Sequence, residues 1–456
     1  MGTVRRVTVN KSGTLPGGLA RRSLRTARLL SLPAGAVALS GEALLRRAAG
    51  QDTDVVRRQL RARNAARTRR VLGELKGGAL KAGQLLATVD ALFPQDPEAT
   101  WTVALAELPE STASALPFSE VEPVLAAELG ADWRRRFTEF GERSVAAASI
   151  GQVHRGVWHD GRAVAVKVQY PGVREALAAD LAVVSALTRV TALVARGMAL
   201  PPLVAEMRQR LAEELDYHRE ARVQRAFADA FRDDPEVRVP EVVAVSSRVL
   251  VTSWLDGRPL TRVAASGSAA ERDRAGELYQ RFLLSGPARA GWLHTDPHPG
   301  NFRLCADGRL GVLDFGSALV MPDGMPHTFG RLISVLLRGE DAEVLAGLRA
   351  EGFVRPGARL EVTKLRDYLA PFTAPARHER FHFSRDWLRS QFARINDPRN
   401  PDFAVALQLT MPAEHLFTHR VWLGCVGVLS QLDATVPVRG ELLRWLPGYM
   451  PPEQSL

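Results

Sequence analysis

Two short motifs constrain the fold of this chain more than any other feature of its sequence. The first is His294-Thr-Asp-Pro-His-Pro-Gly-Asn301, a Pro/Gly-rich loop, and the second is Asp314-Phe-Gly316, which closes an apolar strand. A carboxylate at Asp296, an amide five residues later and a second carboxylate are the groups that phosphoryl transfer uses to orient an attacking hydroxyl and to hold Mg²⁺ against the β- and γ-phosphates. Either motif alone could be an ordinary turn. Their order and spacing together predict a phosphoryl-transfer centre.

Lysine is rare in this chain, and one lysine ends an alternating strand. Only five of the 60 basic residues are lysine. In the run Ala163-Val-Ala-Val-Lys167, alternation puts the alanines and the lysine on one face of the strand and the valines on the other. A lysine on a face of small residues can reach into a nucleotide cleft and neutralise the α- and β-phosphates. The alternative is a surface lysine on an edge strand.

An acidic segment downstream offers ion-pair partners for that lysine. The sequence Glu214-Leu-Asp216-Tyr-His-Arg-Glu220 contains three candidates. We expect these residues on a helix, where Asp216 and Glu220 share a face because they are four residues apart, whereas Glu214 points elsewhere. The alternative is a solvated acidic face paired with Arg219 and Arg222.

The segment before the lysine strand departs from the usual nucleotide-binding loop. Where a protein kinase carries G-x-G-x-x-G, this chain has Ala146-Ala147-Ala148-Ser149-Ile-Gly151. Glycines let the backbone approach phosphates, whereas alanines add Cβ atoms and restrict the loop. The sequence therefore predicts a kinase-like fold in which residues 146–149 form an altered lid over the nucleotide.

In combination, these motifs resemble those of the UbiB/AarF (ADCK-like) family of atypical protein-kinase-like proteins. The resemblance covers about residues 76–316. The matching segments are Lys81-Ala-Gly-Gln84, 145–153, 164–172, 214–220, 294–301 and 314–316. The family implies an α+β, bilobal protein-kinase-like fold, with a small β-rich N-lobe, a large α-helical C-lobe and an N-terminal helical extension over the cleft.

The resemblance also implies roles for individual residues. Lys167 would contact phosphate and pair with Glu220, and Asp296 would occupy the catalytic-base position. Asn301 and Asp314 would hold the metal, and the alanine-rich loop would contribute to cofactor binding.

The Lys81-to-Gln84 motif would belong to the N-terminal extension, with Lys81 facing Glu214 and Asp216 in a regulatory role. In the family this extension blocks the place where a protein substrate would bind. Phosphorylation of proteins in trans is therefore not expected. Taken alone, the motif could be a solvated patch on a helix.

The expected function is that of an atypical kinase or ATPase that uses ATP and Mg²⁺ and supports isoprenoid-quinone or lipid metabolism at a membrane surface. Its expected partners are ATP and ADP, an anionic membrane surface, and phenolic or lipid small molecules. Two alternatives stay open. One is a small-molecule kinase of the aminoglycoside- or choline-kinase type, which would have an open acceptor pocket and no role for Lys81. The other is a non-catalytic, nucleotide-binding scaffold.

The charge of the chain is concentrated at one end. The formal net charge is +10, but residues 1–70 hold 16 basic and three acidic residues (+13), which leaves 44 basic and 47 acidic residues (−3) in the remainder. Because the body is not basic and has no groove-reading motif, no nucleic-acid partner is expected. We expect a basic, partly disordered or membrane-surface arm over 1–50, a helical extension over 51–136, an N-lobe with inserted helices over 137–257 and a C-lobe over 258–456. No segment is expected to span a membrane: the apolar stretches 29–41 and 421–432 are shorter than the ~20 residues needed, and 177–200 carries Asp180, Arg189 and Arg196. The expected location is cytoplasmic, peripheral at the inner face of the membrane.

Overall fold

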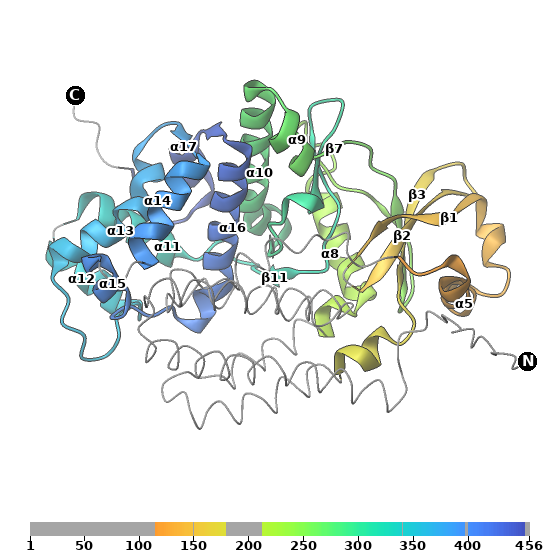
Figure 1. Ribbon diagram of the computed structural model, residues 1–456, viewed down its shortest axis with the longest axis horizontal. Coiled ribbons are helices and arrows are strands. Elements are labelled where there is room, and N and C mark those ends of the chain that lie inside the picture. Colours follow the sequence, from red (N-terminus) through yellow and green to blue (C-terminus); the bar gives the residue numbers. More distant parts are fainter. Residues whose placement is uncertain (1–114, 149, 179–211, 340, 397–399, 452–456) are drawn as a thin grey trace, which may run out of the picture. The chain divides into compact units, whose positions relative to one another are not determined.

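The computed structural model describes residues 115–148, 150–178, 212–339, 341–396 and 400–451 of the chain (Figure 1). Contacts within the chain divide these residues into two compact units. The first holds the described residues up to Tyr217 together with Ala244–Thr252, and the second holds His218–Val243 and the described residues from Ser253 onward. The predicted arm and residues 51–114 of the predicted extension lie outside the described residues. The predicted boundaries at residues 136 and 257 stay predictions.

The first unit is built on a five-stranded sheet with the order β1-β2-β3-β6-β5. Its strands are β1 Phe137–Ala147, β2 Gly151–Trp158, β3 Ala163–Gln169, β5 Val242–Val245 and β6 Val249–Ser253. Strand β2 pairs antiparallel with both β1 and β3. The first three strands therefore form an antiparallel meander.

The alternation predicted for the lysine strand is present in β3. Val164, Val166 and Val168 are fully buried, whereas Lys167 on the opposite face is half-buried. Helix α5, Phe118–Leu129, contacts this strand. The valines and Lys167 therefore lie on opposite faces of the sheet, as the alternation predicts.

The second unit contains mainly helices joined by short strands. Its helices are α8 Tyr217–Ala230, α9 Leu260–Ser266, α10 Ala269–Ala290, α11 His327–Arg338, α12 Asp341–Ala350, α13 Val362–Arg377, α14 Arg385–Asn396, α15 Pro401–Ala406, α16 Leu416–Leu432 and α17 Val438–Trp445. Its strands are β4 Val237–Arg238, β7 Arg258–Pro259, β8 Trp292–His294, β9 Phe302–Leu304, β10 Leu310–Val312, β11 Ala318–Val320, β12 Phe381–His382 and β13 Thr435–Val436. They pair as β4-β10-β9-β7, β11-β8 and β12-β13.

Helix α10 is the central core element of the second unit. It begins with a capping box, in which the Ser268 side chain accepts from the Glu271 amide and the Glu271 side chain accepts from the Ser268 amide. It ends at Gly291, which adopts a φ of 70° that favours glycine. Its buried face includes Tyr279 and Phe282, and it packs against α16, α17 and β8. The strand that leads into the first sequence motif is therefore fixed to the core.

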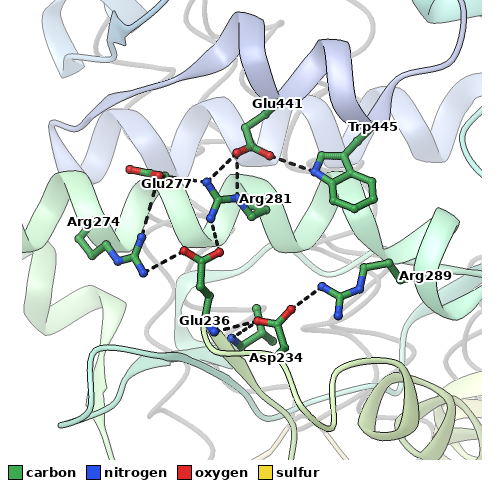
Figure 2. A network of polar contacts seen from close by, with 9 residues as sticks. Asp234, Glu236, Arg274, Glu277, Arg281, Arg289, Glu441 and Trp445 are labelled. Atoms are coloured by element: carbon green, nitrogen blue, oxygen red, sulfur yellow. Dashed lines mark hydrogen bonds and ion pairs between the residues drawn. The ribbon is translucent and has the colours of Figure 1, made fainter.

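An ion-pair network joins the chain segment before β4 to helices α10 and α17 (Figure 2). At its centre, Arg281 of α10 donates to Glu236 and lies 3.0 Å from Glu277 and 2.8 Å from Glu441 of α17. Arg274 makes a second contact with Glu236 at 3.0 Å. One guanidinium thus holds together three segments that are far apart in the sequence.

The β-rich first unit and the α-rich second unit confirm the predicted α+β class. None of the helices in the described part of the chain has the length and hydropathy needed to cross a membrane.

Candidate active site

The first sequence motif forms the loop between β8 and β9. His294 ends β8, a short 3₁₀ turn covers Pro299–Asn301, and Phe302 begins β9. The side-chain amide of Asn301 donates to the Asp296 carboxylate at 3.0 Å and to the Asp296 carbonyl oxygen at 3.4 Å. The structure therefore brings these two predicted site residues into direct contact.

The second motif follows β10, which pairs antiparallel with β9 in a register that sets Val312 opposite Phe302. The Leu313 amide donates to the Asn301 carbonyl oxygen at 2.9 Å, so the strand delivers Asp314 beside the first loop. The Asp314 carboxylate accepts a hydrogen bond of 2.9 Å from the Gly316 amide. A local turn thus fixes the orientation of the second carboxylate.

His294 connects the loop of Asp296 to the loop of Asp314 through a buried hydrogen bond. Its Nε2 lies 2.5 Å from the Asp314 carbonyl oxygen. Because a carbonyl only accepts, Nε2 carries the proton. The ring is 1% exposed and is surrounded by Phe282, Phe302 and Phe315. Burial lowers the pKa of His294, although the Asp314 carbonyl and the nearby carboxylates act in the opposite direction, so the imidazole is neutral at pH 7.

A second connection joins the segments flanking the carboxylates. Strands β8 and β11 pair antiparallel, with His294 opposite Ala318. The Thr295 amide donates to the Ser317 carbonyl at 3.1 Å, and the two hydroxyl groups lie 2.7 Å apart. The residue before Asp296 and a residue shortly after Asp314 are therefore held together by side-chain and backbone bonds.

Helix α8 brings a third carboxylate to this region. Glu220 is 2% exposed, and a Cβ built on Gly316 would lie 3.4 Å from Glu220 Oε2 and 3.3 Å from Asp314 Oδ1. Its burial contradicts the alternative of a solvated acidic face. The absence of a side chain at Gly316 lets the two carboxylates approach the same loop.

Arg219 is a site residue that the sequence reasoning missed. Its guanidinium donates to the carbonyl oxygens of Ala318 at 2.6 Å and Gly316 at 3.4 Å, and it lies over the Trp292 ring. These partners are backbone carbonyl oxygens and an aromatic ring. None of them is a charged side chain that could be recognised in the sequence as an ion-pair partner. Sequence alone therefore gave no signal for this contact.

A family model described as the ABC1 atypical kinase-like domain matches residues 109–346. The chain belongs to this family. The resemblance to UbiB/AarF proteins is thereby confirmed, and similar proteins include an AarF domain-containing protein kinase 1 from Gallus gallus, at 28% identity over 64% of this chain.

Other relatives of this member of the ABC1 family are named as atypical kinases. The chain is 30% identical to atypical kinase coq-8, mitochondrial, of Caenorhabditis elegans, over 83% of this chain and 50% of that protein. It is 32% identical to atypical kinase COQ8, mitochondrial, of Saccharomyces cerevisiae, over 56% of this chain and 50% of that protein. The chain thus spans about half the length of these curated relatives. A solved structure of Rv3197 from Mycobacterium tuberculosis, in complex with erythromycin, is 37% identical, with a TM-score of 0.68, and covers 88% of this chain and 100% of that chain.

The remaining predicted residues of this ABC1 chain lie in the first unit or outside the described residues. Lys167 pairs in register with Val153, and its Nζ lies 5.3 Å from the centre of the Tyr217 ring. Glu220 belongs to the second unit, so its ion pair with Lys167 stays a prediction. Lys81, Gln84 and Ser149 lie outside the described residues.

The alanine-rich segment forms the tip of a hairpin. Ala146 pairs with Val153 and Ala147 with Gln152, so β1 continues further than a loop over 145–153 would allow. The Ala148 amide donates to the Gly151 carbonyl at 2.8 Å and closes the turn. A Cβ at Gly151 would lie 2.2 Å from the Val168 carbonyl oxygen, so the turn needs glycine there.

The expected helical face shared by Asp216 and Glu220 is wrong. Helix α8 begins at Tyr217, and Glu214 is the last residue of a preceding helical segment, separated from α8 by Leu215 and Asp216. The Leu215 carbonyl accepts a hydrogen bond of 3.0 Å from the Gln169 side chain of β3. Because this carbonyl bonds to the sheet, the chain leaves helical geometry and Asp216 precedes the helix.

The residues of the two loops fit a magnesium ion held mainly by phosphate. Within the described residues, no three His, Cys, Asp or Glu side chains are close enough to bind a metal together. The Asn301 amide nitrogen is engaged with Asp296, and its amide oxygen accepts no hydrogen bond in the described part of the chain. Mg²⁺ usually takes one or two protein oxygens and completes its shell with phosphate and water. Asn301 and Asp314 offer that number of oxygens.

Proposed function

We propose that this chain is an Mg²⁺-dependent atypical kinase or ATPase that binds ATP. The contact between the Asn301 amide and the Asp296 carboxylate carries this proposal, because it turns the amide oxygen away from Asp296 while Asp314 is held beside the same loop. In this assignment Asn301 and Asp314 hold the metal, which offsets charge on the β- and γ-phosphates.

Asp296 is the proposed catalytic base, acting on a hydroxyl group or a water molecule. A carboxylate that accepts a hydrogen bond from an amide is favoured in its charged form, which can orient the nucleophile and accept its proton. Lys167 is proposed to contact the α- and β-phosphates and to pair with Glu220, and residues 146–149 to lie over the phosphates. Lys81, Gln84, Glu214 and Asp216 are proposed to regulate access to the site.

The proposed acceptor is a phenolic or lipid molecule at an anionic membrane surface rather than a protein. The names of the COQ8 relatives as mitochondrial atypical kinases are compatible with this class. The net charge of +13 over residues 1–70 supports electrostatic attachment of the N-terminal part to anionic lipid. Deletion of residues 1–50 should then weaken salt-sensitive binding to anionic liposomes, and equal binding would refute the attachment.

The test is ATP turnover by the purified chain, alone and with anionic liposomes plus phenolic quinone-precursor analogues, with Asp314→Asn as the blank. Mg²⁺-dependent turnover that the blank lacks supports the proposal. Transfer to an analogue identifies a kinase, whereas phosphate release alone identifies an ATPase. Nucleotide binding with no turnover under any of these conditions would favour the scaffold instead.

A second candidate function is binding of a macrolide. It is favoured by the 37% identity to Rv3197, whose solved structure is a complex with erythromycin. Titration of the chain with erythromycin should then release or absorb heat with a defined stoichiometry. Absence of binding at concentrations near the solubility of the drug would remove this candidate.

A further inference from the structure

A buried tyrosine of α10 is hydrogen-bonded to the loop that carries Asp296. The Tyr279 hydroxyl donates to the carbonyl oxygen of Pro297 at 2.5 Å, and its ring meets the Phe302 ring edge to face at 4.8 Å. Tyr279 is fully buried, and Pro297 is buried as well. The hydrogen bond therefore acts on the Pro297–His298 peptide unit, the second one after Asp296, without competition from water.

A glycine of α16 meets the same proline from another element. A Cβ built on Gly424 would lie 2.3 Å from Pro297 Cγ and 3.1 Å from Pro297 Cβ. Glycine in the interior of a helix is unfavourable by about 1 kcal/mol relative to alanine. The close approach of the proline ring explains why the helix carries glycine at this position. Helices α10 and α16 pack side by side (Figure 1), so both contacts come from neighbouring helices of the second unit.

Proline transmits its position to the residue before it. The ring restricts the preceding residue to extended backbone geometry, so a displaced ring also displaces Asp296. On its other side, Asp296 is held by Asn301 at 3.0 Å. The Asp296 carboxylate thus accepts from the Asn301 amide, and its backbone leads directly into a proline that two helices contact.

We propose, on the basis of the function proposed above, that Tyr279 and Gly424 are positioning residues that set the place of the Asp296 carboxylate through Pro297. Neither residue belongs to the motifs that the sequence analysis identified. Tyr279 contacts the carbonyl oxygen of Pro297, and Gly424 lies against its ring. The spacing of residues in the sequence does not predict either contact.

The Tyr279 hydroxyl is protonated, and so able to donate its hydrogen bond, over the whole working pH range. Burial raises the pKa of Tyr279 well above its ordinary value, and the neighbouring Cys425 thiol and Asp296 carboxylate act in the same direction. The hydroxyl therefore keeps its proton at every pH at which the enzyme would be assayed.

The first test is Tyr279→Phe, which deletes only the hydroxyl group. We expect kcat for ATP turnover to fall roughly tenfold or more, because a displacement of ~1 Å at a reacting group can reduce rates ~100-fold. The Kd for Mg-ATP should stay within about twofold, since no nucleotide contact is removed. The matched control is Tyr449→Phe, because Tyr449 is also buried and donates to the Ala376 carbonyl at 3.0 Å in the same unit. That control should leave kcat unchanged.

The second test uses two glycines of one helix. Gly424→Ala should lower kcat in the same way as Tyr279→Phe, whereas Gly427→Ala should not. Apart from its chain neighbours and the nearby backbone of its own helix, no heavy atom of the described residues lies within 4 Å of a Cβ built at Gly427, so alanine fits there. An equal loss of kcat in both members of either pair would identify a general loss of stability and overturn the proposal.

Hydrogen exchange of the peptide covering residues 295–302 provides a readout that does not need turnover. Tyr279→Phe should accelerate exchange of this peptide at least threefold, and Tyr449→Phe should not. If the wild-type chain fails to turn over ATP but exchange responds as expected, the proposed function fails and the positioning role stands. If turnover is present and neither kcat nor exchange changes in Tyr279→Phe, the positioning role is wrong.

Discussion

His294 donates a hydrogen bond of 2.5 Å to the backbone carbonyl of Asp314, and this bond joins the loop of the proposed base to the loop of the proposed metal ligand. Replacement by phenylalanine would leave that carbonyl without its donor in a buried site. We expect His294→Phe to lower the free energy of unfolding by roughly 1–3 kcal/mol and to weaken Mg-ATP binding.

His415→Phe is the matched control for this change, measured by urea unfolding. His415 is also buried and lies against Phe329 and Phe353, but its Nδ1 makes no hydrogen bond to the described residues. Phenylalanine should be neutral or stabilising there. Equal destabilisation by both substitutions would show that the hydrogen bond of His294 does not contribute measurably to the free energy of unfolding.

Arg219 couples helix α8 to the segment after Asp314, through the carbonyl oxygens of Gly316 and Ala318. Arg219→Lys keeps the charge but loses the planar fork that reaches two acceptors. We expect kcat to fall about tenfold, measured as ATP turnover at saturating Mg-ATP. Arg222→Lys, on the same helix but exposed, should retain wild-type kcat. Identical rates for both variants and the wild type would exclude a coupling role.

The network around Arg281 should stabilise the second unit. Arg281→Met leaves Glu236 and Glu441 without their shared cation (Figure 2). The expected loss of unfolding free energy is roughly 1–3 kcal/mol, between the effects of breaking exposed and buried ion pairs. Arg389→Met, which breaks an exposed pair with Asp386, should change it by less than about 0.5 kcal/mol. A loss at Arg281 no larger than that at Arg389 would be inconsistent with a stabilising network.

The same network makes stability depend on pH. Burial alone would raise the pKa of Glu236, but hydrogen bonds and charges from Arg281 and Arg274 outweigh it and lower the pKa. A carboxyl group whose pKa is lower in the folded state contributes stability above its unfolded value, near 4.5, and this contribution is lost as the pH falls below it.

His419 predicts a second, separable pH dependence. Burial lowers the pKa of this histidine from 6.5 to about 4. The unfolded chain therefore binds a proton that the folded chain does not, and stability decreases as the pH falls from 6.5 toward 4. His419→Leu should flatten the plot of unfolding free energy against pH in that window. An unchanged slope would mean that His419 does not titrate on unfolding.

The sequence predicted the elements whose signals are local. The alternation of β3 predicted which residues share the face of Lys167. The paired motifs predicted two loops, and the structure brings Asn301 into contact with Asp296 and Asp314 close to both, because turn residues and the ends of strands can be recognised within a few consecutive residues. The break before Tyr217 was not predictable, because it depends on a hydrogen bond from Gln169, far away in sequence.

The contacts of Arg219, Tyr279 and Gly424 likewise could not be predicted from the sequence. Each of them touches backbone atoms or a proline ring of a distant segment. Such contacts impose no pattern of charge or hydropathy on the residues nearby. They become visible only when the helices of the second unit are placed against the two loops.

The most direct test of the account is Mg²⁺-dependent ATP binding by Asp314→Asn, measured by calorimetry with and without Mg²⁺. Asp307→Asn is the control, because Asp307 lies in an exposed turn and pairs with Arg309 at 2.7 Å. We predict that Asp314→Asn loses the Mg²⁺-dependent part of ATP binding and that Asp307→Asn keeps it. Wild-type binding by Asp314→Asn would contradict the assignment of this loop as a metal and phosphate site.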